Sequence, residues 1–157
     1  MPVYQSKLKS REQIAEGTMA FQEAGGIPGR GYRHHSFYFM SIIAQAAHDR
    51  LPHSLYLFYS NYRPEDAPFL DFLRRLEKEN PDYHFIPTMT EMEKSRRPWN
   101  GERGYVDSAM LIKYLNNLNG PIYYLAGPPA MVTAMRKMLL ETKVDEDDIR
   151  IEEFAGY

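Results

Sequence analysis

Hydrophobic residues along the chain group into short continuous runs and into longer segments with helical spacing. The runs predict five strands, and the spaced segments predict four helices. The predicted strands are 18–22, 55–59, 83–89, 122–126 and 149–154, and the predicted helices are 36–50, 65–79, 107–117 and 129–142. Since strands alternate with helices, we expect an α/β fold: an open, parallel, five-stranded Rossmann-like sheet with helices on both faces.

The chain is organised around the stretch from Pro121 to Glu141. Residues 122–126 form an uninterrupted apolar run, which is typical of a strand that is buried on both faces. Gly127 lets the backbone turn sharply or approach a ligand, and Pro129 suits the first turn of a helix. The helix would then begin at the carboxyl edge of the sheet, where open α/β sheets bind ligands and free N–H groups favour phosphates. An ordinary connection between a strand and a helix would give the same pattern.

A polar segment follows the second predicted strand. It contains Ser60, Asn61 and Arg63 before Pro64 opens the next helix. A guanidinium at this place in a dinucleotide fold can grip a 2′-phosphate with two hydrogen bonds, whereas NAD sites usually carry Asp or Glu there. Ser60 could add a hydroxyl to the same phosphate. The alternative is that Arg63 is a solvated residue that caps the helix.

The amino-acid composition excludes several classes of function. The 157 residues are 43% hydrophobic and 25% charged, with a formal net charge of −2, which is ordinary for a globular domain and gives no basic field for nucleic acid or an anionic membrane. The chain has no cysteine, which excludes disulfides, thiolate metal sites and a cysteine nucleophile. The histidines do not form a recognisable metal set, and no catalytic constellation of side chains is apparent. We expect a cytoplasmic protein without a metal or a membrane span.

Several stretches, in order, resemble the nucleotide-binding half of the ferredoxin–NADP reductase family. AGPPAM is similar to the family's Cys-Gly-Pro-Pro-x-Met signature, with Ala126 in place of the cysteine. The other stretches are LYLFYSNYRPEDAPFLDFLRRLE, YHFIPTMTE followed by WNGERGYVD, and the terminal DIRIEEFAGY. Together they lie between Ser54 and Tyr157, about two-thirds of the chain.

The resemblance implies where a dinucleotide would bind. It places the adenosine ribose at residues 60–63, the nicotinamide near Thr88 and the Gly-Pro-Pro turn, and a flavin ring against a C-terminal aromatic residue. Gly25 and Gly26 resemble the start of the family's pyrophosphate loop, but the match ends after Ile27, so the following loop either still binds phosphate or is solvated. The expected cofactor-binding residues are Gly25, Gly26, Ser60, Asn61, Arg63, Thr88, Ala126, Gly127, Pro128, Pro129, Met131, Phe154 and Tyr157.

The family's flavin-binding barrel has no counterpart in this sequence. We therefore expect residues 1–23 to be a leader remnant of the flavin domain and 24–157 to be an NAD(P)-binding domain, unless 18–22 replaces its first strand. The resemblance implies NADP or NAD as cofactor, and FAD that comes from a partner chain or binds loosely. The expected partner is a flavin domain or an electron-transfer protein. The function would be that of a reductase half that delivers hydride to a flavin, weakly or not at all when isolated. The alternative is a truncated, non-catalytic module that binds dinucleotide or self-associates as a dimer.

Overall fold

The computed structural model describes residues 18–23 and 54–151. The strands are β1 (Thr18–Glu23), β2 (Leu55–Asn61), β3 (Tyr83–Met89), β4 (Glu102–Arg103), β5 (Ile122–Leu125) and β6 (Ile149–Ile151). The α-helices are α2 (Leu70–Glu79), α3 (Ser108–Leu115) and α4 (Pro129–Glu141), and the short 3₁₀ helices are η1 (Pro64–Asp66), η2 (Met92–Lys94) and η3 (Glu146–Asp148). The predicted helix 36–50 lies outside the described residues.

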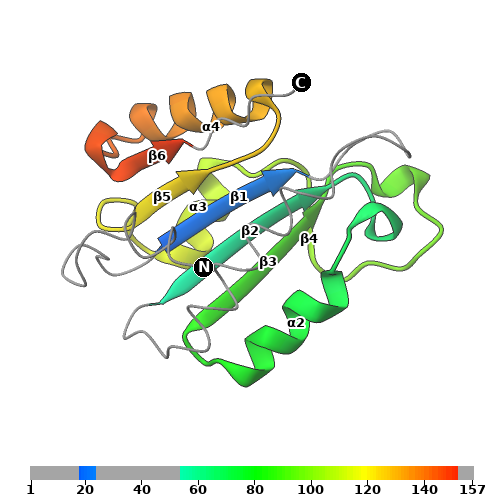
Figure 1. The fold of residues 1–157 in the computed structure, drawn as a ribbon. Coiled ribbons are helices and arrows are strands. Elements are labelled where there is room, and N and C mark those ends of the chain that lie inside the picture. The colour runs from blue at the N-terminus through cyan, green and yellow to red at the C-terminus, as the bar shows by residue number, and fades with distance from the viewer. Residues whose placement is uncertain (1–17, 24–53, 152–157) are drawn as a thin grey trace, which may run out of the picture.

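The strands form one parallel sheet in the order β4-β3-β2-β1-β5-β6 (Figure 1). The sheet therefore has six strands in the described part of the chain, and our prediction of five was wrong. The additional strand, β4, pairs only Glu102 and Arg103 with the end of β3. Two charged residues at a sheet edge leave no hydrophobic run, so the pattern of apolar positions contained no sign of this strand.

Helices cover both faces of the sheet, as predicted. On one face, Phe58, Ile86 and Leu125 pack in a core with buried residues of α3 and α4. On the other face, Leu57, Tyr59 and Phe85 pack against Leu73 of α2. Neighbouring residues of β2 thus point to opposite cores, which explains why this strand reads as a continuous apolar run.

The predicted helix 65–79 is divided in two. Pro68 lacks an N–H group and disfavours helical geometry at the residue before it, and Ala67 is accordingly extended, with φ −88° and ψ 96°. Phe69 then adopts a left-handed conformation, with φ 62°, before α2 begins at Leu70. The sequence pattern joined η1 and α2 because acidic residues after Pro64 resemble the first turn of a helix.

β1 lies in the centre of the sheet and pairs in parallel with both β2 and β5. Residues 18–23 therefore belong to the same sheet as the predicted nucleotide-binding unit, as the alternative for 18–22 proposed. The interpretation of the residues before β1 as a leader remnant stays a prediction. In the described ranges, 18–23 and 54–151, no helix has both the length and the apolarity that a membrane crossing needs.

Candidate dinucleotide-binding site

The order in which strands are added to the sheet changes side at β1. From this strand the chain passes outward through β2 and β3, and later strands β5 and β6 extend the sheet on the other side of β1. The carboxyl ends of β1 and β5 therefore mark a topological switch point, the place where open α/β sheets bind ligands. Because all the strands are parallel, the residues after β2, β3 and β5 meet at this same edge of the sheet.

The turn after β5 exposes the N-terminus of α4 at the switch point. Gly127 has φ 149°, a conformation that side-chain-bearing residues rarely adopt. Pro128 is the N-cap and has no side chain that could accept a hydrogen bond, and the first helical bond runs from the Val132 N–H to the Pro128 carbonyl at 3.0 Å. The N–H groups of Ala130 and Met131 therefore lack a cap, and an anion at this helix end would accept from them.

Asn61, the last residue of β2, has a completely buried side chain. Neither its Nδ2 nor its Oδ1 has a hydrogen-bond partner. The neighbouring Tyr59 hydroxyl donates to the Pro68 carbonyl at 2.7 Å, and burial raises the pKa of this hydroxyl. An amide buried without partners costs free energy, so Asn61 is suited to a ligand that supplies the missing hydrogen bonds.

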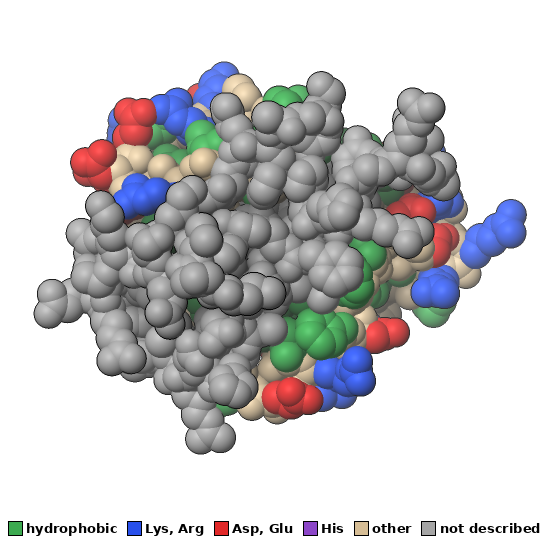
Figure 2. All heavy atoms as spheres, in the orientation of Figure 1, with side chains coloured by type: hydrophobic (Ala, Val, Ile, Leu, Met, Phe, Trp, Pro, Cys, Tyr) green, Lys and Arg blue, Asp and Glu red, His purple; other side chains and the backbone are tan. Residues whose placement is uncertain are grey.

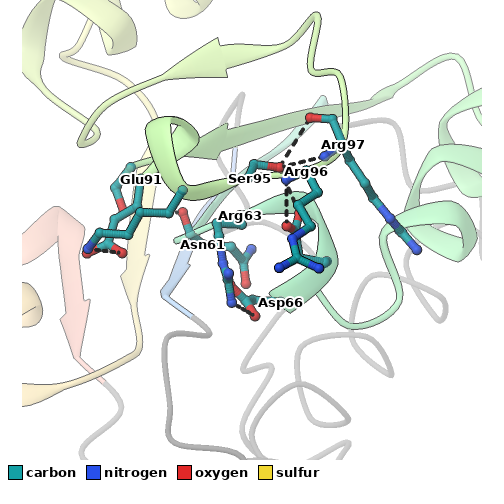
Figure 3. A network of polar contacts seen from close by, with 10 residues as sticks. Asn61, Arg63, Asp66, Glu91, Ser95, Arg96 and Arg97 are labelled. Carbon is teal, nitrogen blue, oxygen red and sulfur yellow. Dashed lines mark hydrogen bonds and ion pairs between the residues drawn. The ribbon is translucent and has the colours of Figure 1, made fainter.

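Arg63 lies just beyond β2 and forms a two-bond ion pair with Asp66 (Figure 3). Its Nε donates to Oδ2 at 2.6 Å and its Nη2 donates to Oδ1 at 2.9 Å. Hydrogen bonding to Asp66 raises the pKa of Arg63 above its ordinary value, so the guanidinium stays charged. Arg63 thus has an acidic partner that the sequence reasoning missed, and its contact with a cofactor stays a prediction.

The segment after β3 is tied to the same turn. The carboxylate of Glu65 accepts from the Ser95 hydroxyl at 2.8 Å and from the Arg96 N–H at 3.1 Å (Figure 3). The exposed side chains of Lys94, Arg96 and Arg97 belong to this segment. Figure 2 shows Lys and Arg side chains interspersed with Asp and Glu side chains over the coloured part of the surface. The segments after β2 and β3 are therefore held together by Glu65, a role that its sequence position did not reveal.

Thr88 and Trp99 have structural contacts. Thr88 is fully buried, and its hydroxyl donates to the Gly104 carbonyl at 2.7 Å. The indole N–H of Trp99 donates to the Glu102 carbonyl at 2.7 Å, and the Arg74 guanidinium lies 5.1 Å from the ring centroid. These contacts anchor Trp99 in the core, while a direct contact between Thr88 and a cofactor stays a prediction.

The remaining predicted residues do not share one environment. Ala126 is buried in the core on the α2 face, and Met131 packs partly against the opposite core. Ser60 is buried, Pro128 is half-buried and Pro129 is exposed. Gly25, Gly26, Phe154 and Tyr157 lie outside the described residues. In the described part of the chain, no group of three His, Asp or Glu side chains is arranged to hold a metal ion.

Glu102 joins β4 to α3. Its carboxylate accepts hydrogen bonds from Lys113 and Tyr114, and these bonds lower the pKa of the carboxyl group. Together with the Trp99 and Thr88 contacts, this arrangement holds residues 99–104 against the carboxyl end of β3. Sequence reasoning had no signal for this pairing, because the partners are more than ten positions apart and lie on different elements.

A large part of the chain is similar in sequence to known proteins. A family model described as the oxidoreductase NAD-binding domain matches residues 37–137. The F component of the Na(+)-translocating NADH-quinone reductase of Methylococcus capsulatus is 31% identical over 94 residues, 58% of this chain and 23% of that protein. The phenol hydroxylase P5 protein of Acinetobacter pittii is 28% identical over 103 residues, 66% of this chain and 29% of that protein. The chain thus spans less than a third of the length of these two relatives.

Solved structures show the same fold. The CS-b5R domains of human Ncb5or in the NAD+ form match with a TM-score of 0.70 and 18% identity, over 91% of this chain and 38% of that one. The ferredoxin reductase in carbazole 1,9a-dioxygenase matches with a TM-score of 0.63 and 23% identity, over 88% of this chain and 38% of that one. The resemblance to the nucleotide-binding half of ferredoxin–NADP reductases is confirmed: the chain belongs to the oxidoreductase NAD-binding domain family.

Proposed function

We propose that this chain binds NAD(P)H at the carboxyl edge of its sheet and presents the nicotinamide for hydride transfer to a flavin. The observation that carries the proposal is the topological switch between β1 and β5, where an uncapped helix N-terminus follows a glycine with positive φ. This combination gives the pyrophosphate backbone N–H donors and gives the nicotinamide close access to the main chain. The family match supports the same reading.

The residues present fit a dinucleotide. The unpartnered amide of Asn61 would hydrogen-bond to the adenosine part, beside Ser60 and the guanidinium of Arg63. The free N–H groups at the start of α4 would bind phosphate oxygens, and the Gly127 turn would support the nicotinamide. When bound, NAD(P)H supplies two electrons and one proton as a hydride, and this chain's task is to hold and orient it.

The flavin in this proposal comes from another domain or chain. Hydride transfer requires the donor and acceptor rings to be held nearly in contact, and that alignment accounts for much of the catalysis. The described residues form one nucleotide-type sheet with its helices and no second sheet that could hold a flavin. The isolated chain should therefore bind dinucleotide weakly and reduce electron acceptors slowly, even with free flavin added.

Equilibrium titration of the chain with NADPH and NADH, followed by the fluorescence of the reduced nicotinamide, tests the proposal. We expect saturable binding of the wild type and at least about 10-fold weaker binding of Gly127→Val, because a side chain at φ 149° is strained and blocks close approach. Gly120→Val is the matched control: its φ is 153°, but it lies at the amino end of β5, away from the site. Equal weakening by both variants, or no binding by the wild type, would reject the proposed site.

A self-associating module that does not turn over substrate is the second candidate. Among the described residues, the exposed large hydrophobic side chains are Tyr105, Ile112 and Ile151, with 71%, 51% and 37% of their surface exposed. Exposed apolar side chains support an interface between copies of the chain where they lie together on one surface. Sedimentation of the wild type and of a Tyr105→Ser, Ile112→Ser variant would show whether these residues hold a dimer together: a monomeric wild type excludes this candidate.

A further inference from the structure

The turn after β2 holds Arg63 and Asp66 close enough to form an ion pair. The Asp66 N–H donates to the Arg63 carbonyl at 3.0 Å, so the two residues are already joined through the backbone. Buried Pro64 follows Arg63 and fixes the start of the turn. The two side chains then meet with hydrogen bonds of 2.6 and 2.9 Å. Little further ordering is needed to form this pair, because the backbone holds its ends together.

The pair uses the part of Arg63 that would recognise a phosphate. A guanidinium binds carboxylate and phosphate through the same fork of N–H donors, so Asp66 and a 2′-phosphate compete for Arg63. The exposed fractions of the two side chains are 36% and 30%, which leaves the pair within reach of a ligand. The neighbouring Glu65 carboxylate is bonded to Ser95 and Arg96 instead, so in the described part of the chain it is Asp66 that bonds Arg63.

We propose that Asp66 is a specificity-determining residue that sets how strongly the site prefers NADPH over NADH. This inference rests on the proposed function, since it assumes that the dinucleotide binds beside Arg63. The 2′-phosphate of NADPH must displace the Asp66 carboxylate from Arg63 and also meets its negative charge. NADH carries no 2′-phosphate, so it leaves the ion pair intact and avoids the repulsion. Asp66 therefore lowers the ratio of NADPH to NADH affinity that Arg63 alone would give.

Removal of the Asp66 charge is the test. The full-length chain and its Asp66→Asn variant are titrated with NADPH and with NADH at low ionic strength. We expect NADPH to bind the variant about 5- to 20-fold more tightly, from the released ion pair and the lost repulsion, and NADH affinity to change less than about 2-fold. Asp71→Asn is the matched control, because it removes the same charge from the exposed first turn of α2 and should leave the NADPH-to-NADH ratio unchanged.

A double variant identifies Arg63 as the group that Asp66 restrains. In Arg63→Gln, Asp66→Asn, the gain in NADPH affinity should disappear, while NADH binding, which also reports that the chain is folded, should remain. An unchanged ratio of NADPH to NADH affinity in Asp66→Asn would overturn the inference while leaving the proposed function intact. Equal losses of NADPH and NADH affinity in Asp66→Asn would also overturn it, because the ion pair would then maintain the structure of the whole site and not the preference for NADPH. A wild type that binds neither cofactor would reject the proposed function, and this inference with it.

Discussion

Replacement of Asn61 by leucine should separate stability from ligand binding. The Asn61 side chain is completely buried, and both of its polar atoms lack hydrogen-bond partners. An unsatisfied buried polar group costs about 1–3 kcal/mol, and leucine has a similar size without the polar atoms. The free energy of unfolding of Asn61→Leu should therefore rise by about 1–3 kcal/mol, while its affinity for NADPH falls by about 10-fold or more through the loss of the amide contacts.

Thr88→Val provides the matched contrast on the neighbouring strand. Thr88 is equally buried, but its hydroxyl is satisfied by the Gly104 carbonyl at 2.7 Å. Its removal leaves that carbonyl without its donor and should lower the free energy of unfolding by about 1–2 kcal/mol.

Urea unfolding followed by the fluorescence of Trp99, the single tryptophan of the chain, measures both variants. A destabilised Asn61→Leu variant, or one that binds NADPH as the wild type does, would refute the view that this amide forms its hydrogen bonds with a ligand.

Substitutions at three further positions test the local structure around the site. Asp107→Ala should lower the free energy of unfolding by about 1 kcal/mol, since the Asp107 carboxylate caps α3, and Asp107→Asn should retain most of it. Gly101→Ala should cost about 1–3 kcal/mol in urea unfolding, because its Cβ would come within 2.6 Å of the anchored Trp99 ring. Hydrogen bonds, above all from Lys113, hold the pKa of Glu102 below its ordinary value in the folded chain. This carboxylate therefore stabilises the fold at pH values above its unfolded pKa, and the contribution is lost as the pH falls through the folded pKa. The stability difference between the wild type and Glu102→Gln should accordingly shrink on acidification; a constant difference would show that Glu102 does not titrate with folding.

The sequence pattern predicted the elements that depend on hydrophobic burial. β2, β3, β5 and α4 occur within two residues of the predicted bounds, because continuous apolar runs and helical spacing report burial directly. The errors have local physical causes. The sequence pattern predicted one helix over 65–79, but Pro68 and the left-handed Phe69 divide it. The two-residue β4 was missed because it forms by pairing with β3 and its own composition does not mark it as a strand.

The positions of the candidate site residues could be predicted further than their contacts. Parallel strands bring Asn61 and Gly127 to one edge of the sheet whatever their neighbours are, so a pattern of strands and turns is enough to place them. The contacts depend on side-chain geometry. An acid three residues after Arg63 is common in a helix start, and only the fold of η1 turns Asp66 into its bidentate partner.

The central claim is that a dinucleotide binds across the carboxyl edge of the sheet, and backbone amide chemical shifts recorded during titration with NADPH test it most directly. We predict that the perturbed amides cluster at two places, Asn61–Arg63 after β2 and Gly127–Met131 at the start of α4. Amides at the opposite edge of the sheet, near Gly120 and Asp82, should not shift. Shifts that cluster at that opposite edge, or no shifts at saturating NADPH, would contradict the account.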